Sequence, residues 1–327
     1  MLVSAAQIQD ILACPRCRSR LSLPQCSNPQ CALDFPVVSG QPALIDFSAS
    51  IVERDALVGT RGASTLPRDP THASFRTRVK RLFIGINRTA IEIGKRFHAD
   101  ILAAADSPTV LVIGGGDFGD GALPMFCDPK VRVIGTDIYA SPNTSLVADG
   151  HQLPFQSASI DGVWIQAVLE HVLDPWRVVA EIHRVLKPGG LVFADTPFMQ
   201  PVHEGPYDYT RFSLSGHRWL FRDFEMVAAG ISSGPPETLN WAIRYFVQAM
   251  ARSNKVGTLT SLAFFWLRPF RALMGPRWAA DAAGGTFFYG RRSDRATTPR
   301  EMVAFYEAQR KLKRGIIEGE SVDASPR

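Results

Sequence analysis

Four of the five cysteines in this 327-residue chain lie within one stretch of eighteen residues near its start. Cys14 and Cys17 are separated by two residues, and Cys26 and Cys31 by four. Two such turns can bring four thiolates to one metal, and a closed tetrahedron of sulfurs is typical of structural zinc. Two disulfides would be the alternative in a secreted module, but the chain opens without the features of a signal peptide. Cys127 stands alone and is expected to be buried.

A second group of residues, in the middle of the chain, suits an adenosine-containing cofactor. The apolar run Thr109–Ile113 leads directly into GGGDFGDG, residues 114–121. Glycines let the backbone approach a ligand closely, and a following helix would point its N-terminus at the site. The next apolar run, residues 131–136, ends at Asp137, whose carboxylate could accept hydrogen bonds from both ribose hydroxyls. Taken alone, these features fit a nicotinamide cofactor and S-adenosylmethionine equally well.

These residues must be positioned by alternating strands and helices. Beyond the two strands above, apolar runs predict further strands at residues 145–148, 160–165, 190–196, 224–231 and 285–290. A helix is expected over residues 175–186, ahead of a Lys-Pro-Gly-Gly turn. This order predicts a doubly wound parallel sheet of the α/β class, with the ligand at the carboxyl ends of the strands.

Several ordered motifs distinguish the two cofactors. DGHQLPF occupies residues 149–155, LEHV residues 169–172 and LKPGG residues 186–190. In this order they resemble the class I S-adenosylmethionine-dependent methyltransferases. The resemblance extends over some ninety residues. It implies a seven-stranded, Rossmann-like sheet with its last strand antiparallel, and S-adenosylmethionine as the cofactor.

The resemblance also implies roles for residues at the adenosine end of the site. Asp137 would hold the ribose, and Ile138 would lie against the adenine. Asp149 would accept a hydrogen bond from the adenine amino group, with Gly150 and His151 beside it.

The methionine end is expected next to residues that leave the first and fourth strands, namely Gly114, Gly116, Gln166 and Ala167. The family often has an acidic residue two positions before the first glycine, where this chain has Val112. Contacts with the methionine amine would then depend on backbone carbonyls, or on Asp117 or Asp120.

The loop after the fifth strand, residues 197–212, is expected to cap the site where the methyl acceptor enters. His203 is the candidate general base, and the alternative is an ordinary surface histidine. The loop resembles methyltransferases of sugar, polysaccharide or lipid assembly. The other candidates for acceptor binding or catalysis are Glu204, Tyr207, Asp208, Tyr209 and Arg211.

The cysteine quartet is followed by ALDFPVVSGQPALIDF, residues 32–47. Together they resemble the zinc-ribbon family of methyltransferase activator proteins, over about residues 8–48. We therefore expect a small N-terminal zinc ribbon (1–48), a linker (49–74), a methyltransferase domain (75–292) and a charged C-terminal helix and tail (293–327). A helical insertion is expected within the catalytic domain, at about residues 238–283.

Two segments, one basic and one rich in aromatic residues, suit more than one kind of acceptor. Residues 75–97 carry seven basic side chains and one acidic side chain, a net +6 that could meet RNA, a phosphate or an anionic membrane, or could be a solvated helix face. The aromatic insertion could lie at a membrane interface or cover a core or pocket. We expect a cytoplasmic protein, with peripheral contact at the inner membrane face as an alternative.

Three functions fit these observations. The first is methyl transfer to an oxygen or nitrogen of a small-molecule, glycan or lipid-linked acceptor. The second is methylation of ribosomal or transfer RNA, and the third is an inactive scaffold that binds a partner methyltransferase. A charged terminal helix, expected over residues 298–318, could be solvated or could make oligomer contacts.

Overall fold

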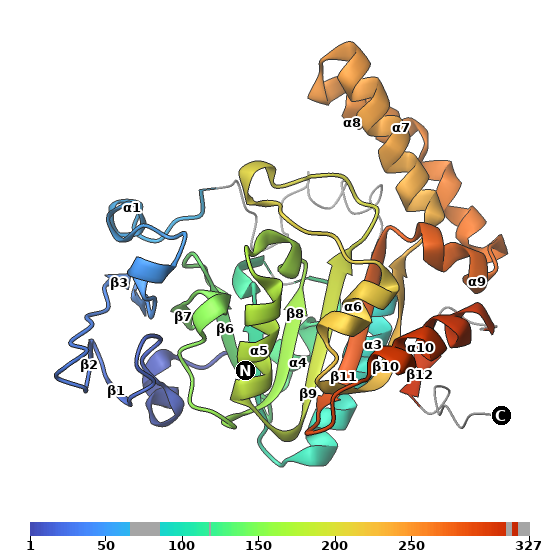
Figure 1. Ribbon diagram of the computed structural model, residues 1–327. Coiled ribbons are helices and arrows are strands. Elements are labelled where there is room, and N and C mark those ends of the chain that lie inside the picture. Colours follow the sequence, from blue (N-terminus) through green and yellow to red (C-terminus); the bar gives the residue numbers. More distant parts are fainter. Residues whose placement is uncertain (66–85, 118, 312–315, 320–327) are drawn as a thin grey trace.

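The structure is a computed structural model that describes residues 1–65, 86–117, 119–311 and 316–319 (Figure 1). Its centre is an eight-stranded sheet in the order β12-β10-β11-β9-β8-β5-β6-β7. The five strands from β9 to β7 are parallel, whereas β11, β10 and β12 are joined by antiparallel pairing. The strands are β5 (Thr109–Ile113), β6 (Arg132–Asp137), β7 (Leu146–Val147), β8 (Ile160–Gln166), β9 (Leu186–Pro197), β10 (Phe224–Ser233), β11 (Gly285–Arg292) and β12 (Ile316–Glu318).

The predicted α/β class and all seven predicted strands are confirmed, but the strand count is one too low. Ile316–Glu318 forms β12, which pairs antiparallel with the outer side of β10. These residues were expected to belong to the C-terminal helix, which in the structure is α10 (Pro299–Lys311). The edge of β10 offers unpaired backbone groups, so a short apolar segment is stabilised there as a strand.

Helices cover both faces of the sheet, as Figure 1 shows. On one face lie α3 (Arg88–Ala104) and α4 (Leu123–Cys127), and on the other α5 (Pro175–Val185) and α6 (Leu214–Leu220). Alternate side chains of β5 serve the two cores: Val110 and Val112 pack with Phe97 of α3, whereas Leu111 and Ile113 pack on the α5 side. A strand buried on both faces therefore reads as an unbroken apolar run. Cys127, expected to be buried, is exposed at the end of α4.

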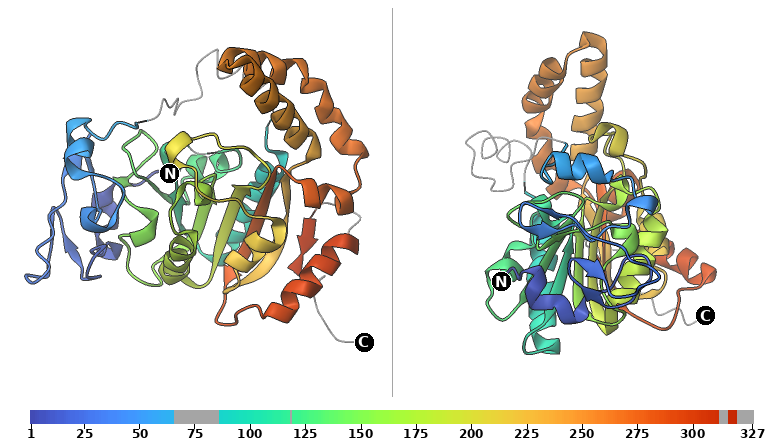
Figure 2. Two further views of the ribbon diagram at one scale, coloured as in Figure 1. Left: turned by 45° about the horizontal axis from the view of Figure 1, so that its top comes forward. Right: turned by 90° about the vertical axis from the view of Figure 1, so that its left-hand side faces the viewer.

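The N-terminal residues form a small unit against the β7 edge of the sheet (Figure 2). It contains a 3-10 helix, η1 (Ala5–Ile11), and two short hairpins: β1 (Leu21–Ser22) with β2 (Gln25–Cys26), and β3 (Val37–Val38) with β4 (Gln41–Pro42). Ala43 makes a parallel bridge to Val147 of β7, and the fully buried side chain of Leu12 shares one core with Phe155. The unit is therefore built onto the central sheet through a shared core.

Part of the expected linker is packed against the body of the protein. Asp46 caps the 3-10 helix η2 (Phe47–Ala49), and α1 (Arg54–Gly59) follows. Leu57 of α1 is buried against Val38 and Val147. Residues 66–74 of the expected linker, and the basic residues from 75 to 85, lie outside the described part of the chain.

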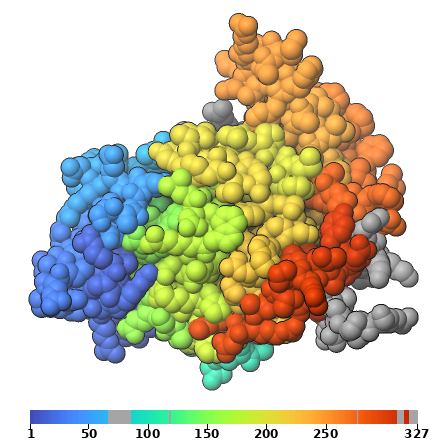
Figure 3. All heavy atoms as spheres, in the orientation of Figure 1, coloured from blue at the N-terminus to red at the C-terminus, as the bar shows by residue number. Residues whose placement is uncertain are grey.

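The helical insertion stands away from the body of the protein over most of residues 235–263 (Figures 1 and 3), whereas Ala279 and Ala280 near its end are buried in the main core. It consists of α7 (Pro235–Ala251), α8 (Asn254–Ala263), the 3-10 helix η7 (Phe265–Leu273), α9 (Pro276–Ala279) and η8 (Ala280–Ala282). The apolar stretch over residues 259–274 is divided at Phe264 between α8 and η7, and Pro269 lies within η7. Within the described residues, no helix is long and apolar enough to cross a membrane.

Candidate active site

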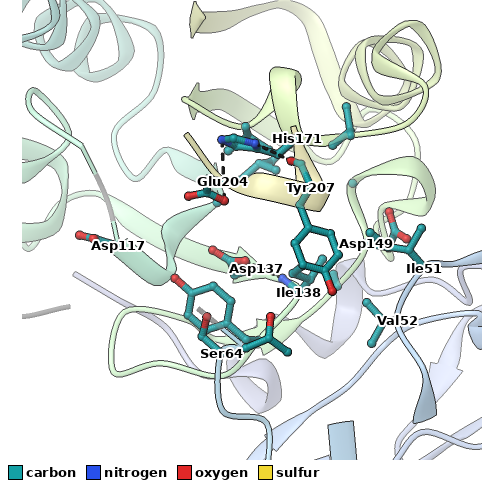
Figure 4. A pocket seen from close by; sticks show the side chains of 18 of the residues that line it. Ile51, Val52, Ser64, Asp117, Asp137, Ile138, Asp149, His171, Glu204 and Tyr207 are labelled. Carbon is teal, nitrogen blue, oxygen red and sulfur yellow. Dashed lines mark hydrogen bonds and ion pairs between the residues drawn. The ribbon is translucent and has the colours of Figure 1, made fainter. Parts of the chain in front are cut away.

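A cavity of about 780 Å³ opens at the carboxyl ends of β5, β6 and β8, where a doubly wound sheet binds its ligands. Figure 4 shows its walls: Asp137 and Ile138 lie centrally, Asp149 lies beside Ile51, and His171, Glu204 and Tyr207 form a group above Asp137. Nine of the ten predicted cofactor-binding residues line the cavity. They are Gly114, Asp117, Asp137, Ile138, Asp149, Gly150, His151, Gln166 and Ala167.

The glycine loop follows β5 directly. Gly114 has a φ of +74°, and a Cβ there would lie 2.2 Å from Val168 Cγ2, so both conformation and space require glycine. Gly116 does not line the cavity, because the ring of Tyr139 covers it. Its amide instead donates a hydrogen bond of 3.0 Å to Asp137 Oδ2, which ties the loop to the end of β6.

Asp149 is buried and has partners on both carboxylate oxygens. Oδ1 accepts from the His151 amide at 2.9 Å and contacts His151 Nδ1 at 2.6 Å, and Oδ2 accepts from the Ser50 hydroxyl at 2.5 Å. Burial acts to raise the pKa of Asp149, but the hydrogen bonds from His151 and Ser50 outweigh it and lower the pKa. The carboxylate is therefore held as an anion in the cavity wall.

An apolar surface lies between the two carboxylates. Ile138 lines the cavity and is 42% exposed, and Ile51 and Val52 approach from the N-terminal side (Figure 4). A flat aromatic ring can be buried against such aliphatic side chains while its polar edge meets a carboxylate. This part of the cavity fits an adenosine moiety.

The opposite end of the cavity carries an unsatisfied polar atom. Gln166 Oε1 is buried and has no hydrogen-bond partner among the residues that the structure describes, while Nε2 donates to Asp195 Oδ2 at 3.3 Å. Burial raises the pKa of Asp195 to about 6, against hydrogen bonds that include one from Asn87. A lone acceptor at this position fits an ammonium donor such as the amine of methionine. The next residue, Ala167, has a φ of +53°, an unusual conformation for a non-glycine residue.

Three titratable side chains from two elements meet beside this end. Glu170 and His171 come from η5 (Leu169–His171), directly after β8, and His203 comes from the loop after β9. His171 Nε2 lies 3.5 Å from Glu170 Oε1, and His203 Nε2 lies 4.0 Å from the same oxygen. Glu170 is fully buried, and burial raises the pKa of its carboxyl to about 8. Glu204 Oε2 is 3.8 Å from His171 Nε2.

The loop that follows β9, residues 198–212, is stabilised by an ion pair. Arg211 contacts both carboxylate oxygens of Asp208 and donates to the Gln200 carbonyl at 2.8 Å. Burial acts to raise the pKa of Asp208, but the Arg211 guanidinium lowers it to about 2. Neither Tyr209 nor Arg211 lines the cavity, so the structure does not bring these two predicted catalytic residues to the site. His203, Glu204 and Tyr207 do line it.

The four N-terminal cysteines converge in space. Cys14 Sγ and Cys31 Sγ are 3.8 Å apart, and Cys17 Sγ and Cys26 Sγ are 3.4 Å apart. Sulfurs bound to one tetrahedral zinc at about 2.3 Å are separated by about 3.8 Å, whereas a disulfide bond is about 2.05 Å long. The four atoms lie within 4.8 Å of one another and therefore fit a zinc site.

Some cavity residues were not singled out from the sequence. Ile51, Val52 and Ser64 belong to a segment read as a linker, yet they line the cavity. Asn87 and Asp195 do not line the cavity, but they bond to a residue that does: Asn87 Nδ2 donates to Asp195 Oδ2 at 2.7 Å, and Gln166 Nε2 donates to the same oxygen at 3.3 Å. Asp195 could have been recognised from the sequence, because it is an acidic residue at the end of an apolar strand. Nothing in the nearby sequence indicates a role for Ile51, Val52, Ser64 or Asn87.

Comparison with known proteins decides the family. Residues 119–194 match the family described as "Methyltransferase domain". An uncharacterized methyltransferase of Mycobacterium tuberculosis is 34% identical over 203 residues, which cover 58% of this chain and 75% of the relative. The chain belongs to this methyltransferase family. An uncharacterized methyltransferase of Mycolicibacterium paratuberculosis is 33% identical over 202 residues, again covering 58% of this chain and 75% of the relative.

A solved structure also aligns with this methyltransferase. It is phosphoethanolamine N-methyltransferase 2 of Haemonchus contortus in complex with S-adenosyl-L-methionine, which is 17% identical with a TM-score of 0.45. The alignment covers 77% of this chain and 62% of that chain. The family and the sheet order together make the protein a class I, S-adenosylmethionine-dependent methyltransferase.

Proposed function

We propose that this methyltransferase transfers the methyl group of S-adenosylmethionine to an oxygen or nitrogen of a small-molecule, glycan or lipid-linked acceptor. The observation that carries the proposal is the division of the cavity. Carboxylates and an apolar wall suit the adenosyl group on one side, and a cluster of titratable side chains follows on the other. Sulfonium and acceptor would meet between them.

The chemistry requires mainly positioning. The sulfonium already carries a good leaving group, so an in-line approach of the acceptor supplies much of the acceleration. In this account Asp137 holds the ribose, Asp149 the adenine edge, and Gln166 Oε1 the methionine amine. The acceptor loses its proton at the cluster of Glu170, His171 and His203.

The helical insertion favours a lipid-linked acceptor within this class. Large apolar side chains are exposed on it, among them Phe246 (67%), Met250 (74%), Leu273 (80%) and Trp278 (70%). Residues 235–282 contain six basic and two acidic residues, a net +4. Exposed aromatic and apolar side chains combined with positive charge suit an anionic membrane interface. We infer that the insertion brings the cavity close to acceptors held in such a membrane.

RNA is the second candidate acceptor, and the basic residues of α3 are those that could contact it. Within the described part of the basic stretch, Arg88 and Lys95 are exposed, but Arg96 is paired with Glu318 at 2.9 Å. Such a surface could contact phosphates, with an affinity that falls steeply with salt. An inactive scaffold is the third candidate, and the open cavity with its polar groups in place argues against it.

The experiment that separates these candidates uses labelled S-adenosylmethionine with RNA, lipid and small-molecule pools from one cell extract. We expect label in the lipid or small-molecule pool and none in RNA. Label confined to RNA would favour the second candidate. Cofactor binding without label in any pool would favour the scaffold.

A further inference from the structure

Glu170 is a buried carboxylate without hydrogen-bond compensation. Its side chain is fully buried, and neither oxygen has a hydrogen-bond partner among residues 1–65, 86–117, 119–311 and 316–319. Burying such a group costs several kcal/mol unless a proton or a cation accompanies it. The nearest side-chain nitrogens are those of His171 and His203.

The tautomer of His171 leaves a lone pair directed at this carboxylate. His171 Nδ1 lies 2.7 Å from the Tyr207 carbonyl oxygen, which can only accept, so Nδ1 carries the proton. In a neutral imidazole the other nitrogen is then an acceptor. That nitrogen, Nε2, faces Glu170 Oε1 at 3.5 Å and Glu204 Oε2 at 3.8 Å. A lone pair that faces two carboxyl groups is unfavourable unless a proton or a metal cation lies between them.

His203 repeats this arrangement from the other side. Its Nδ1 lies 3.2 Å from Asp208 Oδ2, and Arg211 holds Asp208 in place. Its Nε2 lies 4.0 Å from Glu170 Oε1, and its ring meets that of His171 edge to face, with centroids 4.9 Å apart. A histidine that binds a metal through one ring nitrogen usually has its other ring nitrogen held by a carbonyl or a carboxylate.

We propose that Glu170, His171 and His203 bind a divalent transition-metal ion at the acceptor end of the cavity. One ligand atom from each lies within 4.8 Å of the others. Ligands on a tetrahedral ion with bonds of about 2.1 Å are about 3.4 Å apart. His171 Nε2 and Glu170 Oε1, at 3.5 Å, are already at this separation, whereas His203 Nε2, at 4.0 Å from Glu170 Oε1, needs to move about 0.6 Å closer to that oxygen. Glu204 Oε2 lies 3.8 Å from His171 Nε2, at the edge of this group.

The role of this ion in catalysis rests on the proposed function. Two imidazoles and one carboxylate leave coordination positions open, and His171, His203 and Glu204 line the cavity. A hydroxyl bound there would lose its proton to cavity water more readily. The S–CH₃ bond then breaks as the O–CH₃ bond forms, and the sulfonium becomes a neutral thioether. The acceptor would therefore be a hydroxyl, and His203 a ligand in place of the general base predicted from sequence.

Binding of Mn²⁺ to the full-length protein tests the site directly, without cofactor or acceptor. The zinc content is measured first, and free Mn²⁺ is then followed by electron paramagnetic resonance. Four thiolates prefer zinc, so Mn²⁺ does not report on the cysteine site. We expect about one Mn²⁺ per chain, displaced by added Zn²⁺, with affinity reduced about tenfold or more in Glu170→Gln and His203→Gln.

His98→Gln is the matched control, because His98 lies in α3 and is paired with Asp128 at 2.9 Å, away from the cavity. It should bind Mn²⁺ like the unaltered protein. Because Glu170→Gln changes a buried group, His203→Gln on the exposed loop provides the reading if the first variant fails to fold. No binding of Mn²⁺ or of a second Zn²⁺, or equal binding by all variants, would overturn the proposal. Metal binding without cofactor binding would instead contradict only the proposed function.

Discussion

The Ser50 hydroxyl donates a hydrogen bond to Asp149 Oδ2 across 2.5 Å, and this bond joins the segment that follows the N-terminal unit to the wall of the cavity. Asp149 is the residue expected to meet the adenine amino group, and Ser50 immediately precedes Ile51 and Val52 in the apolar wall. A further contact joins the N-terminal unit to the helices of the sheet. Arg18 bonds to Glu181 of α5 at 2.9 Å. The N-terminal unit and the segment that follows it therefore support one wall of the cavity.

Replacing Ser50 tests this connection. In Ser50→Ala the wall segment loses its bond to Asp149, and we expect the Kd for S-adenosylmethionine to rise about two- to tenfold, the value of one hydrogen bond. Calorimetric titration measures it. Ser159→Ala is the control, because its hydroxyl bonds to the Gln156 carbonyl, away from the cavity. Equal affinities for the two variants would mean that the bond does not support the cofactor site.

Loss of the proposed zinc should affect both folding and cofactor binding. Cys26→Ser removes one of the four thiolates, and a ribbon of this size depends on its metal to fold. We expect the zinc content to fall by about one per chain, Tm to fall by about 5 °C or more, and cofactor affinity to decrease. Cys127→Ser, at the exposed cysteine outside the quartet, should change none of these. Full zinc content in Cys26→Ser would refute the site.

Membrane contact by the insertion can be measured with vesicles. The protein should sediment with vesicles containing phosphatidylglycerol more strongly than with pure phosphatidylcholine, because apolar area and positive charge act together. Phe246→Ser combined with Met250→Ser should reduce this binding several-fold while cofactor binding is unchanged. Val303→Ser, an exposed apolar residue on α10, serves as the control. Equal sedimentation of all variants would exclude the insertion as the contact.

His217 makes a predictable contribution to acid sensitivity. It is fully buried between Phe212 and Phe221, and burial lowers its pKa to about 3. The unfolded chain binds a proton near pH 6.5 and the folded chain does not, so stability falls as pH drops from 6.5 toward 3. Between pH 7.5 and 5.5 this group alone should cost about 1.4 kcal/mol.

His217→Asn removes that titration while retaining an acceptor near Nδ1, which contacts Thr286 Oγ1 at 3.1 Å. Urea unfolding at the two pH values should therefore show a smaller loss for the variant than for the unaltered protein, although the variant is less stable at pH 7.5 because a cavity forms. Losses of equal size would show that His217 is protonated in the folded state.

The sheet and its cofactor edge could be predicted because their signals are local. Buried parallel strands such as Thr109–Ile113 appear in the sequence as apolar runs. Asp137 and Asp149 could be recognised because each directly follows such a run. The order of LPF, LEHV and LKPGG then fixed the expected fold. The addition of β12 could not be predicted, because a three-residue strand depends on the free edge of β10 and not on its own sequence.

Contacts between distant segments account for the other differences. Nothing near Ser50 indicates that it meets Asp149, 99 residues away. The sequence marks His203 as a candidate only through its loop. Its contacts with Glu170 and His171 exist because the fold places the residues that follow β8 beside that loop. Arg211 looked suited to acceptor binding, but its guanidinium is engaged by Asp208 and backbone carbonyls.

Calorimetric titration of the full-length protein with S-adenosylmethionine and with its demethylated product tests the central claim most directly. We predict one site per chain for both ligands. In Asp137→Ala, the loss of charge-assisted bonds to two ribose hydroxyls should weaken binding about 100-fold or more. No heat with either ligand at millimolar concentration, from protein shown to be folded, would contradict the account.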